Sequence, residues 1–453
     1  MLDRASLGVF SEVARKLDAG FAKLPDFENQ ALGMERLAEV LNATAERLKD
    51  NYPYFHPLYA GQMLKPPHPV ARLAYALAMW INPNNHALDG GRASSAMEKE
   101  AVAEIAAMFG WKNFLGHLCG GGTMANLEAL WVAGQSHPGK KILASEQAHY
   151  THKRISGVLQ LEFETVPCDA RGRMDAGALA NRAAQGDVGT VVATMGTTAT
   201  GSVDPLPEIL ALREKHGFRV HADAAYGGYF VLAENLGEDA KRAFERIGDA
   251  DSIVIDPHKH GLQPYGCGCV LFRDPSVGRF YKHDSPYTYF SSSELHLGEI
   301  SLECSRPGAA AVALWATQEL LPLIKGGEFA RGLERGRKAA LALNEKIQKD
   351  SRFVPGMVPE LDIVVFAPRA ASASEASGLT RRIFEEAAKR DLHLAVADLP
   401  VQFWEANLRE MKIDRATLSC LRSVLMKPEH LDWVDGIWSR LCEATTAVTG
   451  RRD

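Results

Sequence analysis

The sequence has few cysteines and no long uncharged apolar run. Seven cysteines are scattered through 453 residues without the spacing of a disulfide framework, which indicates a reducing compartment. The nearest approach to a membrane span is VARLAYALAMWI at 70–81. It is shorter than the roughly 18 to 20 apolar residues that cross a bilayer, so we expect a buried helix there. The first 21 residues carry charges throughout, which argues against a secretory signal and predicts a cytoplasmic protein.

An excess of charge of one sign is also lacking. The chain has 51 basic and 56 acidic side chains and a formal net charge of -5, so no overall field draws it to nucleic acid or to an anionic membrane. Apolar residues make up 46% and charged residues 24%, the balance of a globular protein. We therefore expect two or three units that fold together and bind a small molecule.

Helical and strand patterns divide the chain into three parts. Residues 1–51 read as two amphipathic helices, which the Pro- and aromatic-rich stretch from Tyr52 ends. Residues 52–308 alternate helical patterns such as MEKEAVAEIAAMFG with short apolar runs such as KKILAS, VGTVVATMG, FRVHADAA and DSIVIDP. This alternation predicts an α/β domain with a mostly parallel sheet. Residues 309–453 add helices to the strand candidates DIVVFAP and ATLSCLRSVLM, and predict a smaller α/β domain.

Asp223 stands at the end of one predicted strand, FRVHA, and small residues follow it in AAYGG. Open parallel sheets bind ligands at the carboxyl ends of their strands, and small residues let a flat ring approach the backbone. Asp223 is therefore a candidate cofactor ligand. A capping or turn aspartate would leave the same pattern.

Lys259 follows the next predicted strand, SIVID, in the segment PHKHG. A lysine amine that is desolvated or close to cations loses its proton more easily and can then form a Schiff base with an aldehyde. His258 and His260 fit such an environment, which makes Lys259 a candidate nucleophile. The alternative is a surface lysine between two structural histidines.

A candidate phosphate site precedes both residues. The segment HLCGGGTMANLEALWVAG at 117–134 joins a glycine turn to the start of a helix, where free backbone N–H groups and the helix dipole favour an anion. Thr123 adds a hydroxyl to these main-chain donors. An ordinary glycine-rich loop would have the same composition.

Two further motifs are rejected. GQSHPGKK at 134–141 has the spacing of a P-loop, but Lys141 stands where Ser or Thr binds magnesium, and the order of helix and strand is reversed. Cys267 and Cys269 have no second pair at metal-ligand spacing, and HYTH at 149–152 has no third ligand. No metal site is predicted.

The three candidate features occur in an order that resembles fold type I, aspartate aminotransferase-like, pyridoxal-phosphate enzymes. The blocks SEQAHYTHKR, VVATMGTTATGSVDPL, HADAAYGG, DPHKHGLQPYGCGCVLFRD and SLECSRPG are similar to successive blocks of the group II decarboxylase family. This resemblance covers residues 52–308, and 421–434 more loosely. It implies a large domain on a mostly parallel sheet of the seven-stranded type, with pyridoxal 5'-phosphate as cofactor. The implied reaction is decarboxylation of an L-amino acid to its amine and CO2.

The resemblance also implies roles for single residues. Lys259 would be the Schiff-base lysine, Asp223 the partner that keeps the pyridine nitrogen protonated, and His149 the residue stacked on the ring. Other implied cofactor contacts are Thr123, Met124 and His258 at the phosphate, Thr198 near the ring hydroxyl, Ala225 under the ring, and Ser305 supplied by a dimer mate.

Proton donation is implied for a loop tyrosine, and YKHDSPYTYFSSSELHLG at 281–298 offers Tyr287 and Tyr289 without a choice between them. The sequence departs from the aromatic amino acid decarboxylases at two positions. Asp256 replaces an asparagine, and its carboxylate would repel a phosphate unless it points away. His260 replaces a tryptophan. The substrate therefore stays open.

Other activities on the same scaffold also stay open. SRPG at 305–308 resembles sphingosine phosphate lyase, and an aldehyde-forming decarboxylase would carry similar blocks. Arg422 could hold a carboxylate in an aminotransferase, a class that HADAAYGG and DPHKHG disfavour. The presence of Lys259, Asp223 and His149 disfavours a non-catalytic pyridoxal-phosphate carrier.

The family pattern places five residues at the substrate entrance, namely Tyr54, Phe55, His56, Tyr59 and Gln62. This aromatic set slightly favours an aromatic substrate. The resemblance further implies a homodimer with its active site at the interface, in which residues 1–51 clasp the partner.

Overall fold

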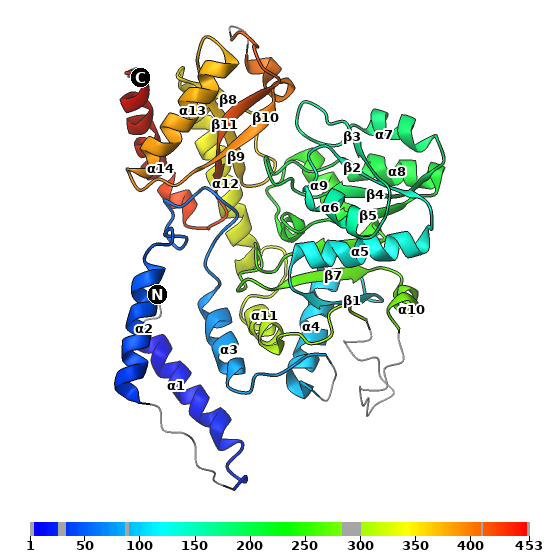
Figure 1. Cartoon of the computed structure of the whole chain (residues 1–453), viewed down its shortest axis with the longest axis vertical. Helices are drawn as coiled ribbons and strands as arrows, with labels where there is room; N and C mark the ends of the chain where they lie inside the picture. The colour runs from blue at the N-terminus through cyan, green and yellow to red at the C-terminus, as the bar shows by residue number, and fades with distance from the viewer. Residues whose placement is uncertain (1–3, 26–32, 87–89, 283–299, 409–410, 451–453) are drawn as a thin grey trace.

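The computed structural model describes residues 4–25, 33–86, 90–282, 300–408 and 411–450 (Figure 1). Helices α1 (Arg4–Ala19) and α2 (Met34–Leu48) project from the rest of the molecule. Neither helix contains a buried residue. The predicted pair of amphipathic helices is confirmed, and their apolar faces meet no core within the described part of this chain.

Helix α3 (Pro69–Met79) forms within the apolar stretch at 70–81, but the expected burial is wrong. Only Ala71 and Ala78 are buried, whereas Trp80, just beyond the helix, is 69% exposed. The reason is that α3 packs mainly against one neighbour, α11 (Gly308–Leu320), so that its end remains uncovered. Where the chain is described, no helix is both long and apolar enough to cross a membrane.

The larger sheet has seven strands in the order β1-β7-β6-β5-β4-β2-β3. Their bounds are β1 (Leu115–Cys119), β2 (Lys141–Ser145), β3 (Phe163–Val166), β4 (Val188–Thr194), β5 (Arg219–Asp223), β6 (Ser252–Ile255) and β7 (Gly268–Phe272). Only β7 runs antiparallel to its neighbours, β1 and β6. The mostly parallel seven-stranded sheet is thus confirmed. Central strand β4, VGTVVAT, is buried at every residue, as expected where helices cover both faces of a sheet.

Helices connect and cover these strands. They are α4 (Arg92–Met108), α5 (Gly122–Ser136), α6 (Thr151–Val158), α7 (Ala176–Ala183), α8 (Leu206–His216), α9 (Glu238–Glu245) and α10 (Gly278–Tyr281). Helix α5 crosses β4, β5, β6 and β7 (Figure 1). Local signals set several helix limits. The Asp175 side chain accepts from the Ala178 N–H at 2.7 Å to start α7, and Gly217, at φ 73°, ends α8.

The C-terminal part is built on an antiparallel sheet in the order β10-β11-β9-β8. It comprises β8 (Phe353–Pro355), β9 (Ile363–Pro368), β10 (Ala395–Pro400) and β11 (Thr417–Val424), with α12 (Glu328–Lys349), α13 (Ala373–Ala388) and α14 (His430–Thr449) packed around it. Both strands predicted from the sequence in this part are confirmed as β9 and β11.

The core runs between the two sheets without a break. One cluster of buried apolar side chains extends from Ala101 to Met426. A second cluster fills the C-terminal part and includes Leu58 and Ala60 from the segment after α2. The Ala60 N–H donates to the His393 carbonyl at 2.9 Å, and the Val424 N–H donates to the Ala60 carbonyl at 2.7 Å. The division into residues 1–51, 52–308 and 309–453 stays a prediction, and residues 58–60 pack with the C-terminal sheet.

Candidate active site

The carboxyl ends of β4, β5 and β6 and the start of α5 meet at a cavity of about 590 Å³. Parallel strands bring their carboxyl ends to the same edge of a sheet, which is where ligands bind in such folds. Eight of the residues proposed from the sequence line it: Thr123, Met124, His149, Thr198, Asp223, Ala225, His258 and Lys259. Residues far apart in the sequence are therefore brought to one place.

Asp223 ends β5 and is 6% exposed. Its Oδ2 lies 2.7 Å from Nε2 of His152, which is completely buried. Burial raises the pKa of the Asp223 carboxyl, but the hydrogen bond and charge of His152, with His221 and Lys259 nearby, outweigh it and hold the pKa below its usual range. Asp223 is thus kept ionised, as a group that pairs with a protonated ring nitrogen needs to be.

His149 lies at the start of α6 and is half-buried. The Thr151 N–H donates to its Nδ1 at 3.2 Å, and Thr151 Oγ1 is 2.5 Å from the same atom. Burial lowers the pKa of His149, which favours the neutral ring. Because Nδ1 accepts from the backbone, the proton of the neutral ring is at Nε2.

Lys259 lies on the loop after β6, and its Nζ is 3.0 Å from Oδ2 of Asp256. Asp256 is 2% exposed, so the carboxylate points at the lysine from inside the protein. The environment expected for Lys259, with a histidine on each side, is only half right. Nε2 of His258 lies 3.6 Å from the same Asp256 oxygen, but His260 points the other way.

His260 is 1% exposed, and its Nε2 lies 2.8 Å from Oδ2 of Asp362 on the C-terminal side of the core. The hydroxyl of Tyr226 donates to the other oxygen of Asp362 at 2.5 Å. The imidazole therefore joins the two parts of the molecule and is bonded to groups other than Lys259. The bonds to Asp362 and to the Tyr226 carbonyl explain why this flanking histidine turns inward.

The candidate phosphate site is a turn at Gly121, which has φ 141°, followed by the first turn of α5. A Cβ on Gly121 would lie 3.0 Å from Cε1 of His258, and one on Gly122 would lie 2.7 Å from Oδ2 of Asp256. Glycine is required at Gly121 by its backbone and at Gly122 by the closeness of Asp256. The first N–H groups of α5 lack helical acceptors and are available to an anion.

Thr198 lies on the loop after β4, and Arg422 of β11 holds this loop. The buried guanidinium donates to the carbonyl of Thr198 at 2.6 Å and to that of Ala199 at 3.1 Å. Burial lowers the pKa of Arg422. The guanidinium is occupied by backbone carbonyls, so it positions Thr198 and does not provide the free carboxylate site considered for an aminotransferase.

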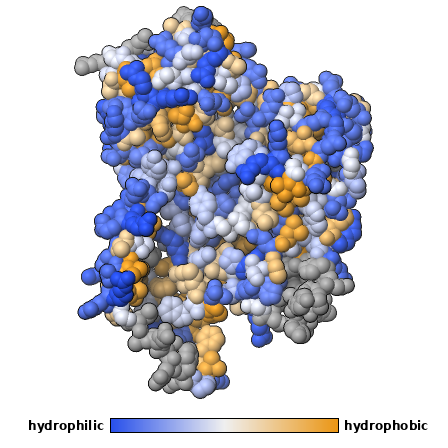
Figure 2. All heavy atoms as spheres, in the orientation of Figure 1, coloured by the Kyte–Doolittle hydropathy of each residue, from blue (hydrophilic) through white to orange (hydrophobic). Residues whose placement is uncertain are grey.

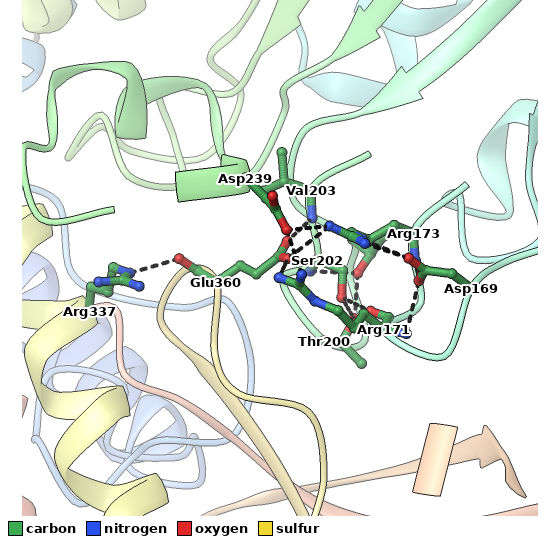
Figure 3. Close-up of polar contacts among 10 residues, drawn as sticks. Asp169, Arg171, Arg173, Thr200, Ser202, Val203, Asp239, Arg337 and Glu360 are labelled. Carbon is green, nitrogen blue, oxygen red and sulfur yellow. Dashed lines mark hydrogen bonds and ion pairs between the residues drawn. The ribbon is translucent and has the colours of Figure 1, made fainter. Parts of the chain in front are cut away.

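Glu360 holds the same loop from the other side (Figure 3). It precedes β9 and accepts from the Val203 N–H at 2.6 Å and from the guanidinium of Arg171. Its own carbonyl accepts from Nε of Arg337 in α12 at 2.8 Å. Figure 3 shows Glu360 reaching across to Arg171 and Arg173, which also contact Asp239. The loop that carries Thr198 is thus tied to the C-terminal part at two points.

Several proposed residues lie elsewhere. Ser305 is exposed, accepts from Nδ2 of Asn84 at 3.1 Å, and is not among the residues lining the cavity. Tyr287 and Tyr289 lie outside the described residues. The five residues expected at the substrate entrance do not line this cavity either, because the chain from Leu58 onward turns to pair with the C-terminal part.

Sequence reasoning missed four polar residues at the site. His152 was read only as a non-metal histidine, and Asn126, Thr194 and Glu303 were not singled out. Oε2 of Glu303 accepts from the Gly120 N–H at 3.0 Å at the edge of the candidate phosphate site. Asn126 Oδ1 lies 2.8 Å from Nε2 of His221, behind Asp223. A signal existed only for His152, which lies one helical turn from His149.

The arrangement fits pyridoxal 5'-phosphate. The Asp223 carboxylate, the Lys259 amine and the start of α5 suit, respectively, its ring nitrogen, its aldehyde and its phosphate. In the described part of the structure, Nδ1 of His258 and Oγ1 of Thr194 are buried without a hydrogen-bond partner, although both residues line the cavity. Buried polar atoms rarely lack a hydrogen-bond partner, so we expect a ligand to form hydrogen bonds with these two atoms.

Comparison with known proteins agrees with this fit. Residues 138–369 match the pyridoxal-dependent decarboxylase conserved domain. The chain is 29% identical to an L-tyrosine decarboxylase from Enterococcus faecium, with 64% of each chain covered. It is also 29% identical to a probable L-tyrosine/L-aspartate decarboxylase from Methanocella arvoryzae, with 77% of this chain and 88% of the relative covered.

A solved structure of Oryza sativa TDC with PLP and tryptamine superimposes with a TM-score of 0.77 at 19% identity, covering 98% of this chain and 99% of that one. The predicted fold type is confirmed. The match spans 64% of the length of the Enterococcus tyrosine decarboxylase. Pyridoxal 5'-phosphate, the cofactor expected from the sequence, is confirmed by the family match. The chain belongs to the pyridoxal-dependent decarboxylase family.

Proposed function

We propose that this protein decarboxylates an L-amino acid to the corresponding amine and CO2, and that its preferred substrate has an aromatic side chain. The observation that carries the proposal is the meeting of Asp223, His149 and Lys259 at one cavity beside the N-terminus of α5. The matching relatives named tyrosine decarboxylases support the aromatic preference.

Bound pyridoxal phosphate supplies a ring that accepts the electron pair released when the bond between Cα and the carboxylate breaks. Asp223 makes this possible by holding a proton on the ring nitrogen. Its carboxylate stays ionised because His152 and His221 lower its pKa against the effect of burial. Thr123 and Met124, with the N-terminus of α5, would bind the phosphate group, and Thr198 and Ala225 would contact the ring; all four line the cavity.

Lys259 is the proposed point of covalent attachment. A Lys259 amine released by the amine of the substrate would take up, at Nζ, the proton that the substrate amine gives up, and the Asp256 carboxylate at 3.0 Å would pair with the resulting ammonium charge. The lysine is thereby held at the wall of the cavity, ready to return. This role accounts for an acidic residue at a position next to the phosphate site.

His149 is proposed to stack on the ring and to control the proton at the reacting carbon. With Nδ1 occupied by the Thr151 N–H, its Nε2–H is the group that can donate. The side chain ring of Tyr150 packs against His149 with centroids 4.4 Å apart and restricts its rotation. Tyr287 or Tyr289 stays the proposed proton donor of the loop.

We further propose a homodimer clasped by residues 1–51. The apolar side chains of α1 and α2 are exposed in a single chain, including Leu7, Val9, Leu41 and Leu48. Figure 2 shows apolar side chains among polar ones on this projecting part. An amphipathic helix pair with no core of its own requires a partner surface, and closed twofold assemblies are the commonest solution. All seven cysteines are free thiols, which supports a reducing, cytoplasmic location.

Two measurements test the function. Borohydride reduction followed by peptide mass analysis should find the cofactor on Lys259, and attachment at another lysine would contradict the proposal. Screening L-amino acids for release of CO2 should give the highest rate with an aromatic substrate. Amine and CO2 in equal amounts are expected. Aldehyde with peroxide would instead indicate an aldehyde-forming enzyme, and transamination or retro-aldol products would indicate other classes.

A further inference from the structure

A second cavity has a volume of about 720 Å³ and shares no lining residue with the first. It is bounded by the segment before α3, by the first turns of α12 and by residues 427–429 after β11. In Figure 1 the segment that leads to α3 runs beside α12. None of the residues assigned to the reaction lines this cavity.

Two lysines, Lys65 and Lys427, line it. Lys427 is 2% exposed, and its Nζ donates to the Tyr59 carbonyl at 2.6 Å and lies 5.3 Å from the centre of the Tyr59 ring. Lys65 is half-buried, and its Nζ donates to the Met426 carbonyl at 3.4 Å. Neither lysine forms an ion pair with any carboxylate in the described ranges. One buried and one half-buried lysine are therefore partnered only by neutral groups among the described residues.

Keeping both lysines protonated without an anionic partner costs free energy. Burial lowers the pKa of Lys65 to about 8, and burial together with the charge of Lys65 lowers that of Lys427 to about 7. Asp362 and Glu429 act in the opposite direction on Lys65, and Glu429 does so on Lys427, without restoring ordinary values. Buried charges are normally paired, and an anion bound in the cavity would pair with both lysines.

The rest of the lining indicates what kind of anion fits. Apolar side chains cover part of the cavity, among them Leu262, Phe329 and Leu333. The other charged residues of the lining are Arg72, Arg331, Arg335, Glu328 and Glu429. Arg335 is paired with Asp432 at 2.6 Å, and Arg331 donates to the Gly326 carbonyl at 2.6 Å. The volume is far larger than a bare inorganic anion needs. A ligand with one oxyanion group and an apolar body matches both surfaces.

We propose that this cavity binds a small organic monocarboxylate, with its carboxylate between Lys65 and Lys427 and its apolar body on the Phe329 and Leu333 side. The site is separate from the reaction cavity but shares a wall with it. His260 lines the second cavity, Tyr226 lines the first, and both bond to Asp362.

The test is calorimetric titration of 3-phenylpropanoate into holoenzyme whose cofactor has been fixed by borohydride and freed of excess. Fixing the cofactor blocks the reaction cavity, so activity is not the readout. One binding site is expected. Lys427→Met and Lys65→Met should each weaken binding about tenfold, because each removes a charged hydrogen bond to the ligand. Lys338→Met, at an exposed lysine of α12, should leave the affinity within about twofold.

A second titration uses inorganic phosphate as the ligand. It should neither bind this site with comparable affinity nor displace 3-phenylpropanoate. Equal affinity in wild type and both lysine variants, or equal loss in Lys338→Met, would overturn the site. Tighter binding of phosphate would overturn the choice of a monocarboxylate. If Lys427→Met does not fold by circular dichroism, Lys65→Met decides alone, since Lys65 is only half-buried and makes a single long hydrogen bond.

Discussion

Oδ2 of Asp256 lies 3.0 Å from Nζ of Lys259, and the carboxylate that makes this contact also lies under Gly122 at the candidate phosphate site. The other carboxylate oxygen, Oδ1, is buried without a partner among the residues described. The buried negative charge of Asp256 thus attracts the ammonium group of Lys259 and repels a phosphate bound at Gly122. The first effect favours catalysis and the second weakens cofactor binding, so a substitution of Asp256 should change the two in opposite directions.

Asp256→Asn should bind pyridoxal phosphate more tightly and turn over more slowly. Removing the charge relieves repulsion of the phosphate by about 1 kcal/mol, or roughly fivefold in Kd, at the effective dielectric of a partly solvated site. The same change removes the ionic partner of Lys259, and we expect kcat to fall about tenfold. Fluorescence titration of the apoenzyme and steady-state rates would measure both. Asp435→Asn, at an exposed aspartate, is the control, and weaker cofactor binding in Asp256→Asn would refute the argument.

His152→Leu should move the acid limb of the kcat profile to higher pH. The substitution removes the hydrogen bond and charge that lower the pKa of Asp223, while burial continues to raise it. Part of the Asp223 population then becomes protonated near neutral pH and no longer holds the ring nitrogen. A loss of about tenfold in kcat at neutral pH is expected, with KM changed less than about twofold.

His152→Gln should restore much of this loss, since an amide N–H can donate to Asp223. Lys153→Gln, at the exposed neighbouring position, should leave the profile unchanged. A role of His152 in packing alone would lower activity without moving the acid limb, and that result would remove His152 from the positioning of Asp223.

Much of the fold could be predicted because its strands carry strong local signals. Strand β4 has no charged residue and is buried throughout, β5 ends at Asp223, and Asp256 directly follows β6, each acidic residue standing at a sharp change to small or polar residues. Burial was harder to foresee. The apolar stretch that forms α3 is covered mainly on one side, and sequence alone does not show which neighbours a helix finds.

The residues of the candidate site also fall into those that could be predicted from the sequence and those that could not. Lys259 and Asp223 stand at strand ends, so the topology of a parallel sheet was enough to bring them together. His260 could not be placed, because its direction depends on Asp362, 102 residues away in the C-terminal part. Glu303 and Arg422 reach the site through contacts of similarly long range. Such contacts leave no periodic pattern in the sequence.

Glu360→Ala should destabilise the apoprotein by about 2 kcal/mol, because it leaves the buried Val203 N–H without its acceptor and removes one of the two carboxylates paired with Arg171. Glu360→Gln keeps an acceptor for Val203 and should cost about half as much. Urea unfolding measures both values. Glu405→Gln, at an exposed position, should stay within about 0.5 kcal/mol of wild type. Equal stability of Glu360→Ala and wild type would show that this contact does not hold the loop.

His430→Asn should make the protein less sensitive to acid. His430 begins α14, is fully buried, and its Nδ1 accepts from the Lys427 N–H at 3.1 Å. Burial lowers its pKa to about 3, whereas an unfolded histidine titrates near 6.5. Between these values the unfolded chain binds one more proton than the folded chain, so this contribution to stability is complete above about pH 6.5 and declines as the pH falls.

Between pH 7.5 and 5.5 the loss from one such histidine is about 1.4 kcal/mol. Urea unfolding of the apoprotein at these two values should therefore show wild type losing about 1.4 kcal/mol more than His430→Asn. The asparagine can accept from the Lys427 N–H through its amide oxygen, so the variant is expected to fold. His56→Asn, at a half-buried histidine outside the core, serves as the matched control and should keep the wild-type slope. Parallel losses in wild type and His430→Asn would mean that His430 titrates as it does in the unfolded chain, and that its burial does not contribute to acid sensitivity.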